Sequence, residues 1–524
     1  MTGPQTWGDG IGTEAVRGVL MRTYTDRPRQ VATLLDMADR WGQRPHVVQG
    51  DVVLTFAQLR HAARVKATEL ARRVGPGDRV VMIGFNSQDW IINFWATVTV
   101  GAVPVLGNAW WSPADVAECL TTVGPALVLA DSRASRHLPP GAPTGRWSCD
   151  LAADTTPFAP PSGAAACDED APAALVFTSG TEGRPKAVVL SHRSLLAGLH
   201  MLLHVTKRLP HQVDDNTGDA GLHTGPMFHI GGIQTLLRAI VVGDTLVMPT
   251  GKFEPAEVLR LIEQWRIARW SAVPTMVSRV LEHPDRNRRD LSSLRSVTVG
   301  GAPVHAEFLA QLRGGLPGVD PRVATGWGLT ENGGQATAAS GRDTRDRPGS
   351  CGRPLPLVEI RIAEADGEIL VRSPTQMIGY FGVDTSPIDG QGWLHTGDLG
   401  HVDDDGYLWI TGRAKDMIIR GGENIAPAAV EQALAALPGV IEAAVFGVPS
   451  TDLGEEVMAV VVVEPGRTEQ ELVDSLRGRI ASFAMPSRWR LQHETLPTTH
   501  SGKIDKSGLA AQARADLAAA GEKQ

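Results

Sequence analysis

The segment from Ala174 to His192 combines residue types that could hold a phosphate group. It reads ALVFTSGTEGRPKAVVLSH, an apolar run that leads into a loop of hydroxyls, glycines and two cations, Arg184 and Lys186. Glycine lets backbone N–H groups approach phosphate oxygens, hydroxyls add donors, and the cations offset negative charge. The loop lacks the GxxxxGK[ST] spacing of a Walker A motif. A loop of this kind is, on its own, more often an ordinary turn, so the rest of the chain decides its meaning.

Six further motifs follow, and with Thr178–Lys186 they resemble one known family. The order and the residues of the seven motifs are similar to those of the ANL superfamily of adenylate-forming enzymes. This superfamily includes acyl-CoA synthetases, adenylation domains of peptide synthetases and luciferases. The resemblance covers the chain from about residue 50 to 510. The six motifs are PMFHIGG (Pro226–Gly232), GGAP (Gly300–Pro303), GWGLTEN (Gly326–Asn332), WLHTGDLG (Trp393–Gly400), GRAKDMIIRGGENIAP (Gly412–Pro427) and LPTTHSGKIDK (Leu496–Lys506).

The resemblance implies a reaction in which a carboxylate oxygen attacks the α-phosphorus of ATP and displaces pyrophosphate. Catalysis of such a step rests mostly on positioning and charge neutralisation. By resemblance, Lys503 would bridge the carboxylate and the α-phosphate, Thr330 would contact phosphate oxygens, and His229 would lie beside the acyl group. The residues implied to bind ATP or AMP are Thr178, Ser179, Gly180, Thr181, Lys186, Gly301, Ala302, Pro303, Trp327, Asp398 and Arg413.

The resemblance also implies sites for a metal ion and for coenzyme A. Glu331 and Thr181 would hold Mg²⁺ that bridges the phosphates. Gly421 and Gly422 would let the narrow pantetheine arm of coenzyme A pass close to the backbone. Lys415 would be the hinge about which a small domain rotates between adenylation and thioester formation.

Each implied role has a plainer alternative at the same residue. Asp398 and Arg413 are expected to hold the ribose, and Trp327 to stack on adenine where the family more often has tyrosine. Taken singly, Asp398 could be a turn aspartate and Lys503 a solvated loop lysine. Trp327 could be a core aromatic, and His229 a core histidine.

The acyl pocket is expected between the histidine motif, the stretch WSAVPT that contains Trp270 and Val273, and Gly326. Small residues there, and the 13 tryptophans of the chain, favour a roomy apolar site. Such a site would take a bulky cyclic or a long aliphatic acid. The alternative is that these tryptophans are ordinary core residues.

Two positions depart from the common wording of the phosphate loop. Glu182 stands where threonine is usual, and Ala187 where glycine is usual. A carboxylate about 4 Å from a phosphate would repel it by several kcal/mol at an effective dielectric near 20, unless Glu182 faces solvent or pairs with Arg184. The Cβ of Ala187 matters if the backbone there needs a positive φ. These departures raise the hypothesis that ATP is used weakly and preformed acyl-AMP is preferred.

Short apolar runs alternate with amphipathic segments from about Val53 onward. This alternation predicts parallel β-sheet with crossover helices. Ser87 and Ser112 are suitable N-caps for two of the helices. The elements expected first are strands at 79–84, 103–106 and 127–130 and helices at 87–100 and 113–122.

The chain is expected to fold as a large N-terminal domain of stacked parallel α/β layers with a smaller, mobile C-terminal α+β lid. We place the AMP- and acyl-binding domain at residues 1–412 and the lid at 413–524. The stretch 137–171, rich in Pro, Ala and Gly, is predicted to be an exposed connector, and 368–411 to be β-rich. Within the lid we expect helices at 426–437 and 469–482 and strands at 443–447, 456–463 and 489–493.

Composition narrows the function class. The formal net charge of −8 gives no electrostatic reason to expect nucleic acid. The four cysteines form no CxxC pair, so neither a zinc site nor a disulfide framework is indicated. No apolar run approaches the roughly 20 residues of a membrane span, and the N-terminus does not resemble a secretory signal. A cytoplasmic location is therefore expected.

These observations predict an acyl-CoA ligase that activates a hydrophobic acid through acyl-AMP. Its expected partners are the acid or its adenylate, ATP and coenzyme A, with a homodimer as one option for assembly. The alternatives are a ligase biased toward preformed acyl-AMP, an adenylating enzyme that loads a carrier protein, and a non-catalytic acyl- or nucleotide-binding protein. A luciferase-like oxygenase is more remote.

Overall fold

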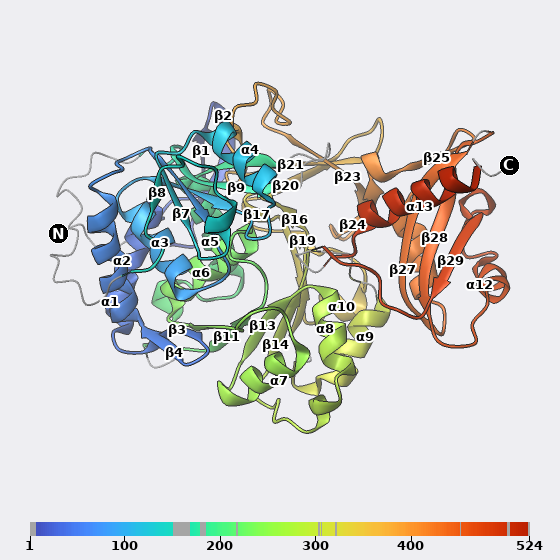
Figure 1. Cartoon of the computed structure of the whole chain (residues 1–524), viewed down its shortest axis with the longest axis horizontal. Helices are drawn as coiled ribbons and strands as arrows, with labels where there is room; N and C mark the ends of the chain where they lie inside the picture. The colour runs from blue at the N-terminus through green and yellow to red at the C-terminus, as the bar shows by residue number, and fades with distance from the viewer. Residues whose placement is uncertain are drawn as a thin grey trace.

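Figure 1 shows the arrangement of the chain in a computed structural model, which describes residues 7–149, 168–178, 185–215, 218–301, 304, 306–319, 322–450, 452–499 and 503–521. Residues drawn from blue through yellow to light orange form a large N-terminal part, and those drawn in deeper orange and red form a smaller part beside it. The large part contains mainly parallel sheets, and the small part combines helices with a mixed sheet. The predicted fold class is confirmed.

The first sheet carries the strands that flank the phosphate loop. The pairs β5–β6, β5–β7, β6–β9 and β7–β8 are parallel, whereas β9–β10 and β10–β22 are antiparallel. Phosphate-loop residues therefore join two adjacent antiparallel strands. In sheet order the strands are β22 (Gly379–Tyr380), β10 (Lys186–Ser191), β9 (Pro172–Thr178), β6 (Val103–Gly107), β5 (Arg79–Ile83), β7 (Leu127–Ala130) and β8 (Thr144–Gly145).

The second sheet has a parallel centre with antiparallel strands at its edges. Its central strands from β15 to β3 pair in parallel, and β4, β18 and β19 join antiparallel. In sheet order the strands are β19 (Arg353–Pro354), β18 (Thr337–Ser340), β15 (Val323–Thr325), β14 (Ser296–Val299), β13 (Arg269–Ala272), β11 (Ala220–His223), β12 (Thr245–Met248), β3 (Pro45–Gln49) and β4 (Val52–Thr55).

Helices form layers inside and outside these two sheets. The largest apolar core contains residues of four long α-helices and of shorter helical segments, together with strands of both sheets, so this helix layer lies between the sheets. Ser87 and Ser112 accept hydrogen bonds from the helix N-termini that they were predicted to cap. The inner helices are α2 (Phe56–Leu70), α3 (Gln88–Thr99), α5 (His192–Val205) and α6 (Ile230–Val242). The outer helices are α4 (Pro113–Val123) on the first sheet and α7 (Pro255–Gln264), α8 (Pro274–Glu282) and α9 (Ala306–Gly315) on the second.

Smaller elements complete the large part. An antiparallel third sheet leads toward the C-terminal part, as expected for the β-rich stretch. Its strands are β20 (Glu359–Ile362), β21 (Glu368–Arg372), β23 (Leu394–Val402) and β24 (Leu408–Arg413). The remaining elements are the hairpins β1 (Ile11–Val16) with β2 (Val19–Tyr24) and β16 (Gly328–Leu329) with β17 (Gly334–Gln335), and the short helices α1 (Ala38–Trp41) and α10 (Asp343–Asp346).

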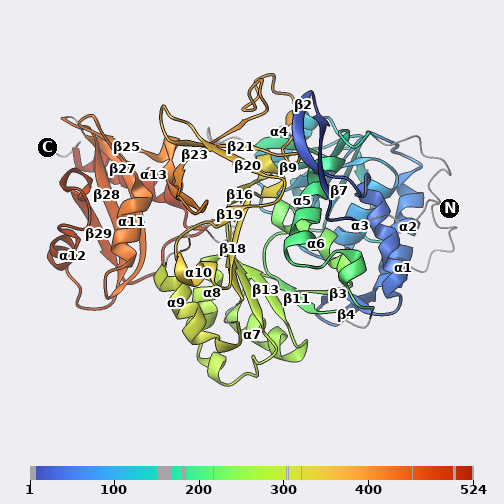
Figure 2. The same ribbon diagram turned by 180° about the vertical axis from the view of Figure 1, so that it is seen from behind.

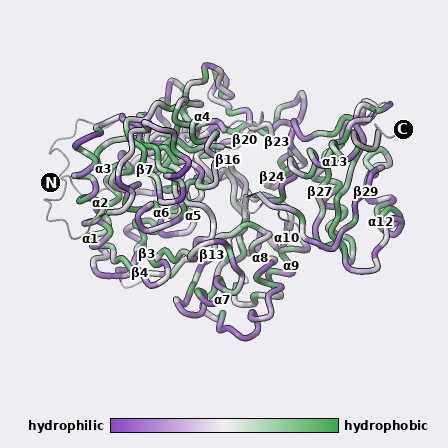
Figure 3. Tube along the Cα trace, viewed as in Figure 1, coloured by the Kyte–Doolittle hydropathy of each residue, from purple (hydrophilic) through white to green (hydrophobic). Residues whose placement is uncertain are grey.

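The C-terminal sheet is covered by helices on both faces. One apolar core joins it to α11 and α12 and a second joins it to α13, and Figures 1 and 2 show α13 and α11 on opposite sides of the sheet. Its central strands are hydrophobic, while α12 is largely hydrophilic (Figure 3). The elements are β25 (Ile418–Arg420), β26 (Glu423–Ile425), α11 (Pro427–Ala435), β27 (Val440–Ser450), β28 (Gly454–Val463), α12 (Glu469–Leu476), β29 (Arg488–Gln492) and α13 (Lys506–Gly521).

Two predicted segments differ from the structure. Helix α12 ends at Leu476 instead of reaching residue 482, and Gly478 then adopts a φ of 78°, a conformation that ends helices. The predicted connector is not simply exposed, because its first part contributes β8 and packs Trp147 against the main core. The backbone carbonyl of Trp147 accepts a hydrogen bond from buried Asn93 at 2.8 Å. Residues 150–167 of the connector lie outside the described residues.

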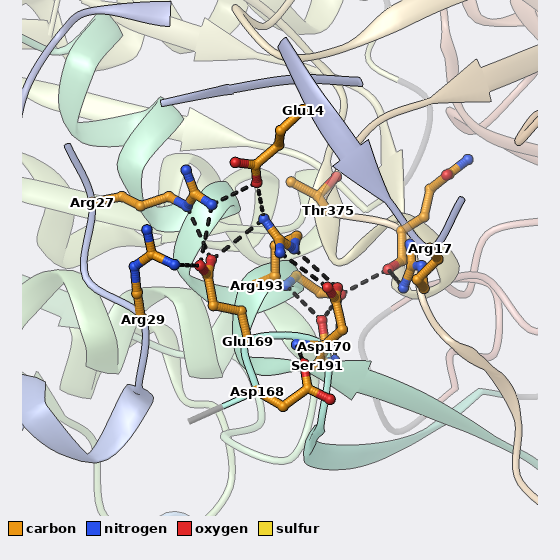
Figure 4. Close-up of polar contacts among 12 residues, drawn as sticks. Glu14, Arg17, Arg27, Arg29, Asp168, Glu169, Asp170, Ser191, Arg193 and Thr375 are labelled. Atoms are coloured by element: carbon orange, nitrogen blue, oxygen red, sulfur yellow. Dashed lines mark hydrogen bonds and ion pairs between the residues drawn. The ribbon is translucent and has the colours of Figure 1, made fainter. Parts of the chain in front are cut away.

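A cluster of charged side chains, centred on buried Glu169, ties the N-terminal hairpin to the first sheet (Figure 4). Glu169, just before β9, accepts hydrogen bonds from Arg27 Nε at 3.0 Å and Arg29 Nη1 at 2.6 Å. Arg193 of α5 pairs with Asp170 at 2.9 Å and with Glu14 of β1. The contacts of Glu169 with Arg27 and Arg29 and of Arg193 with Glu14 join residues 140 to 179 positions apart in the chain, so they hold the hairpin against α5.

Replacing Arg193 by Met removes this buried cation and keeps most of the side-chain length. We expect the free energy of unfolding of the N-terminal part to fall by about 1–3 kcal/mol, because Asp170 loses its ion pair while Glu169 and Glu14 keep theirs with Arg27. Arg342→Met, which breaks the exposed pair with Asp346 (2.8 Å), should change it by less than about 1 kcal/mol. Urea unfolding followed by tryptophan fluorescence compares the two variants, and equal effects would contradict a stabilising role for the cluster.

Candidate active site

The phosphate loop joins the end of β9 to the start of β10. Thr178 and Lys186 face each other in the register of these strands, with Thr178 Oγ1 3.5 Å from the carbonyl oxygen of Lys186. The base of the loop is therefore formed by two residues that the sequence predicted to bind phosphate. Ser179, Gly180, Thr181, Glu182 and Arg184 lie outside the described residues.

Ala187 causes no strain in the backbone. It lies within β10, paired with Phe177, and its carbonyl accepts a hydrogen bond from the N–H of Phe381 at 2.8 Å. Among the described residues other than glycine, positive φ occurs only at Arg17, Lys207 and Arg266. The concern that Ala187 needs a positive φ was therefore wrong, because the position is an ordinary strand residue whose side chain is buried.

Glu331 and Lys186 both lie against the side chain of Tyr380. Thr330 begins a short 3-10 helix, Thr330–Asn332, that presents Glu331. Tyr380 Oη donates to Glu331 Oε1 at 3.0 Å, and Lys186 Nζ lies 5.4 Å from the centre of the same ring. Burial, followed by the nearby charge of Glu331, raises the pKa of Tyr380, so its hydroxyl stays protonated. The geometry thus links the implied metal ligand to the phosphate-loop lysine.

Tyr380 was not singled out by the sequence analysis. It belongs to β22, which pairs with β10 so that Tyr380 lies opposite Val188. The one available signal was its rarity, since the chain has three tyrosines. Its contact with Glu331 depends on a strand pairing across almost 200 residues, which local sequence does not reveal.

Asp398 is held from both sides of its carboxylate. It lies opposite Arg413 in the pairing of β23 with β24, and Arg413 Nε is 2.6 Å from Asp398 Oδ1. Trp327 Nε1 donates to Asp398 Oδ2 at 2.7 Å. Trp327 is 8% exposed and packs in an apolar core. The structure therefore brings these three predicted nucleotide-binding residues together.

Lys503 reaches this region from the C-terminal part. A Cβ placed on Gly301 would lie 3.6 Å from Lys503 Cε and 3.6 Å from Val273 Cγ1, so the three residues adjoin. The pKa of Lys503 is lowered mainly by desolvation and then by the charge of Arg413, while Asp398 opposes both effects. Its side chain nevertheless retains solvent access. Ala302 and Pro303, the next two residues of the GGAP motif, lie outside the described residues.

His229 is the N-cap residue of α6 and lies near enough to Lys503 to be affected by its charge. Burial lowers its pKa to about 4, and the positive charge of Lys503 contributes in the same direction. The imidazole is therefore neutral near pH 7. The ring centre of Phe228 is 4.8 Å from His229 and 5.6 Å from Trp110. These rings provide an apolar neighbourhood for the histidine.

The three residues predicted to line the acyl pocket lie in different surroundings from one another. Val273 lies beside Gly301 and Lys503, and a Cβ on Gly326 would lie 2.3 Å from the carbonyl oxygen of Thr337. Trp270 is 1% exposed, packs in the core of the second sheet and donates from Nε1 to Thr224 Oγ1 at 3.1 Å. Trp270 is therefore a core tryptophan, and its prediction as a pocket-lining residue was wrong.

The implied hinge and coenzyme A residues follow β24. Lys415 is exposed in the 3-10 turn Ala414–Asp416, between β24 and β25. Gly421 and Gly422 form the tight turn between β25 and β26, with φ of 59° and 88°. Positive φ at both positions is typical of a type I′ hairpin turn, which glycine adopts without strain.

Comparison with known proteins agrees with this geometry. The family model of AMP-binding enzymes matches residues 34–381, and that of their C-terminal domain matches residues 429–503. The chain belongs to the AMP-binding enzyme family. This is the ANL superfamily that the motifs resemble, and the protein is an AMP-forming acid–thiol ligase that uses ATP and coenzyme A.

Relatives of this AMP-binding enzyme span almost its whole length. It is 33% identical to 3-[(3aS,4S,7aS)-7a-methyl-1,5-dioxo-octahydro-1H-inden-4-yl]propanoyl:CoA ligase of Rhodococcus jostii (strain RHA1), over 93% of this chain and 99% of that protein. It is 34% identical to feruloyl-CoA synthase of an Amycolatopsis species, over 88% and 95%. O-succinylbenzoate coenzyme A synthetase of Bacillus subtilis, solved with ATP and a magnesium ion, has a TM-score of 0.76 at 27% identity, over 91% and 98%. In the described part of the enzyme, no helix is long and apolar enough to cross a membrane.

Replacing Tyr380 by Phe in this enzyme should weaken its use of magnesium-bound ATP. The ring and its contact with Lys186 remain, but Glu331 loses a hydrogen bond, so kcat/KM for ATP should fall about tenfold. The Mg²⁺ concentration for half-maximal pyrophosphate release should rise. Tyr407→Phe is a matched control, since its hydroxyl donates to Asp343 Oδ1 at 2.6 Å. Equal effects of the two changes would contradict a role for Tyr380 at the site.

Proposed function

We propose that this enzyme ligates a hydrophobic carboxylic acid to coenzyme A through an acyl-AMP intermediate. The observation that carries the proposal is the position of Lys503, which extends from the C-terminal part to Gly301, near Asp398, Arg413 and His229. A lysine carried by one part into a polar site of the other is the arrangement that adenylation needs.

In the adenylation step, the chain would mainly position the reactants and balance their charge. Asp398 accepts hydrogen bonds from the ribose hydroxyls, and Arg413 holds the other side of that carboxylate. Lys503 neutralises charge between the acid and the α-phosphate. His229, neutral near pH 7, lies beside the acyl group without adding a second positive charge.

Magnesium fits this site as an ion bound together with the nucleotide. Among the described residues, no group of three or more His, Cys, Asp and Glu side chains could hold a metal by itself. Mg²⁺ commonly uses one or two carboxylates together with phosphate oxygens. Glu331 would be the protein carboxylate, with Thr181 as the second predicted ligand. The ion would offset the negative charge of the phosphates.

The thioester step would use another position of the C-terminal part. Lys415 lies in the exposed turn that joins the two parts, where a change of backbone angles can rotate one against the other. The Gly421–Gly422 turn carries no side chains, so it lets the pantetheine arm approach the backbone. The domains are accordingly residues 1–412 and 413–524.

The substrate is an acid with a large apolar group, bulky and cyclic or long and aliphatic. Support comes from the partly buried Trp110, whose ring packs 5.6 Å from Phe228 beside His229, and from the relative named for a bicyclic propanoyl group. The test is a panel of cyclic, aromatic and long-chain acids, with AMP, pyrophosphate and acyl-CoA measured separately. The proposal predicts equal amounts of the three products for a large apolar acid. Preference for acetate or another small polar acid would contradict it.

The same assay separates the alternatives. A carrier-loading enzyme would release pyrophosphate but transfer the acyl group to a carrier-protein thiol instead of coenzyme A. A ligase biased toward preformed acyl-AMP would make thioester from acyl-AMP much faster than from ATP and acid. The strand geometry of Ala187 removes one argument for that bias, and Glu182→Thr tests the other. A non-catalytic binding protein would give none of the products.

A further inference from the structure

Backbone packing fixes the position of Trp327. A Cβ on Gly326 would lie 2.3 Å from the carbonyl oxygen of Thr337, and one on Gly328 would lie 2.2 Å from the carbonyl oxygen of Gly334. Because the neighbouring chain comes so close, only glycine fits on both sides of Trp327. The N–H of Trp327 also donates to Thr337 Oγ1 at 3.2 Å. The tryptophan is therefore locked in place before any nucleotide binds.

The indole of Trp327 is mostly covered by protein. With 8% exposure it packs in the core that contains Tyr24, Leu355 and Leu408. The polar edge of the ring faces Asp398, and its Nε1 donates to Oδ2 at 2.7 Å. A tryptophan in this setting fixes its partner firmly, because neither the ring nor its single donor can turn away.

Asp398 has little freedom of its own. It is 3% exposed, and its Oδ1 accepts from Arg413 Nε at 2.6 Å. Arg413 is about half exposed and lies next to the exposed turn that contains Lys415, so its side chain is less firmly held. Trp327 therefore provides the fixed contact. Each carboxylate oxygen keeps a further lone pair that can accept a hydrogen bond from a ligand.

We propose that Trp327 is a positioning residue whose indole N–H orients the Asp398 carboxylate toward the ribose hydroxyls of ATP. This inference rests on the proposed function, in which Asp398 binds the ribose. It assigns Trp327 a role that differs from the expected stacking on adenine, because the role requires the N–H and not the face of the ring. Removing the N–H alone should weaken recognition of the sugar hydroxyls.

The test replaces Trp327 by β-(3-benzothienyl)alanine, introduced at this codon by amber suppression. This side chain keeps the shape and apolar faces of the indole and has sulfur in place of N–H. Pyrophosphate release is measured with ATP, 2′-dATP and 3′-dATP, since the deoxy nucleotides each lack one ribose hydroxyl. The same replacement at Trp409 is the matched control, because Trp409 Nε1 donates to Asp403 Oδ2 at 3.0 Å in a similar pair.

We expect kcat/KM for ATP to fall about tenfold at Trp327, the size of one hydrogen bond to a charged group. For the deoxy nucleotide that lacks the hydroxyl bound by Asp398, kcat/KM should fall much less. The ratio of kcat/KM for ATP to kcat/KM for that deoxy nucleotide should therefore decrease. The same replacement at Trp409 should leave this ratio unchanged. Unchanged discrimination at Trp327 overturns the inference, even if overall activity falls. Failure of the proposed function is recognised separately, as wild-type enzyme that releases no pyrophosphate or does not discriminate between ATP and either deoxy nucleotide.

Discussion

Lys503→Ala should abolish most adenylation while leaving thioester formation from supplied acyl-AMP nearly intact. The lysine contributes positive charge next to Gly301 and Asp398, where the proposed reaction places the α-phosphate during the attack of the acid. Loss of a single stabilising group of this kind typically reduces kcat by a factor of about 100–1,000. Pyrophosphate release with saturating acid and ATP measures the first step, and acyl-CoA formation from acyl-AMP measures the second.

The contrast between the two steps is the informative result for Lys503. A variant that fails only in adenylation is folded and binds coenzyme A, so the second step serves as an internal control. Equal loss in both steps would mean that Lys503 supports the fold or the binding of both substrates. Full adenylation activity would mean that the lysine does not act there.

Lys415→Pro should have the opposite effect and block thioester formation. Lys415 lies in the exposed turn between β24 and β25, the connection that we propose as the hinge of the C-terminal part. Proline restricts φ to about −65°, so it prevents a large change of backbone angle at this residue. We expect transfer from acyl-AMP to coenzyme A to fall about 100-fold or more, as misplacement of reacting groups can cause.

Lys415→Ala provides the control for this experiment. It removes the same charged side chain but leaves the backbone free, so it should keep most of the thioester activity. If Lys415→Pro transfers acyl groups to coenzyme A at the rate of Lys415→Ala, the hinge lies elsewhere. If both half-reactions fail only in the proline variant, the turn is needed to build the adenylation arrangement itself.

The layers of the fold could be predicted because they depend on local patterns. The run at 79–84 became β5, and helices α3 and α4 begin after Ser87 and Ser112 because these caps satisfy backbone N–H groups locally. The N-terminal hairpin was not predicted, because its position depends on ion pairs with Glu169 and Arg193, far along the chain. Helix α12 was predicted too long because amphipathic spacing was given more weight than Gly478.

The residues of the candidate site likewise divide into those that the sequence identified and those that it did not. Motif wording identified Asp398, Arg413 and Lys503, and the structure brings them together. The motifs could not identify Tyr380, because its contact with Glu331 depends on a strand pairing between distant segments. Nor could the motifs show that the indole N–H of Trp327 donates a hydrogen bond to Asp398. Residue types follow from the chemistry of the reaction, whereas such contacts follow from tertiary packing.

The most direct test of the central claim follows oxygen from the acid to the nucleotide. An acid from the panel that yields acyl-CoA is labelled with ¹⁸O in both carboxylate oxygens and incubated with ATP, Mg²⁺ and coenzyme A. If the carboxylate attacks the α-phosphorus, each AMP carries one ¹⁸O atom, and AMP, pyrophosphate and acyl-CoA form in equal amounts. Unlabelled AMP, or ADP and phosphate as products, would contradict an acyl-AMP intermediate and with it the proposed function.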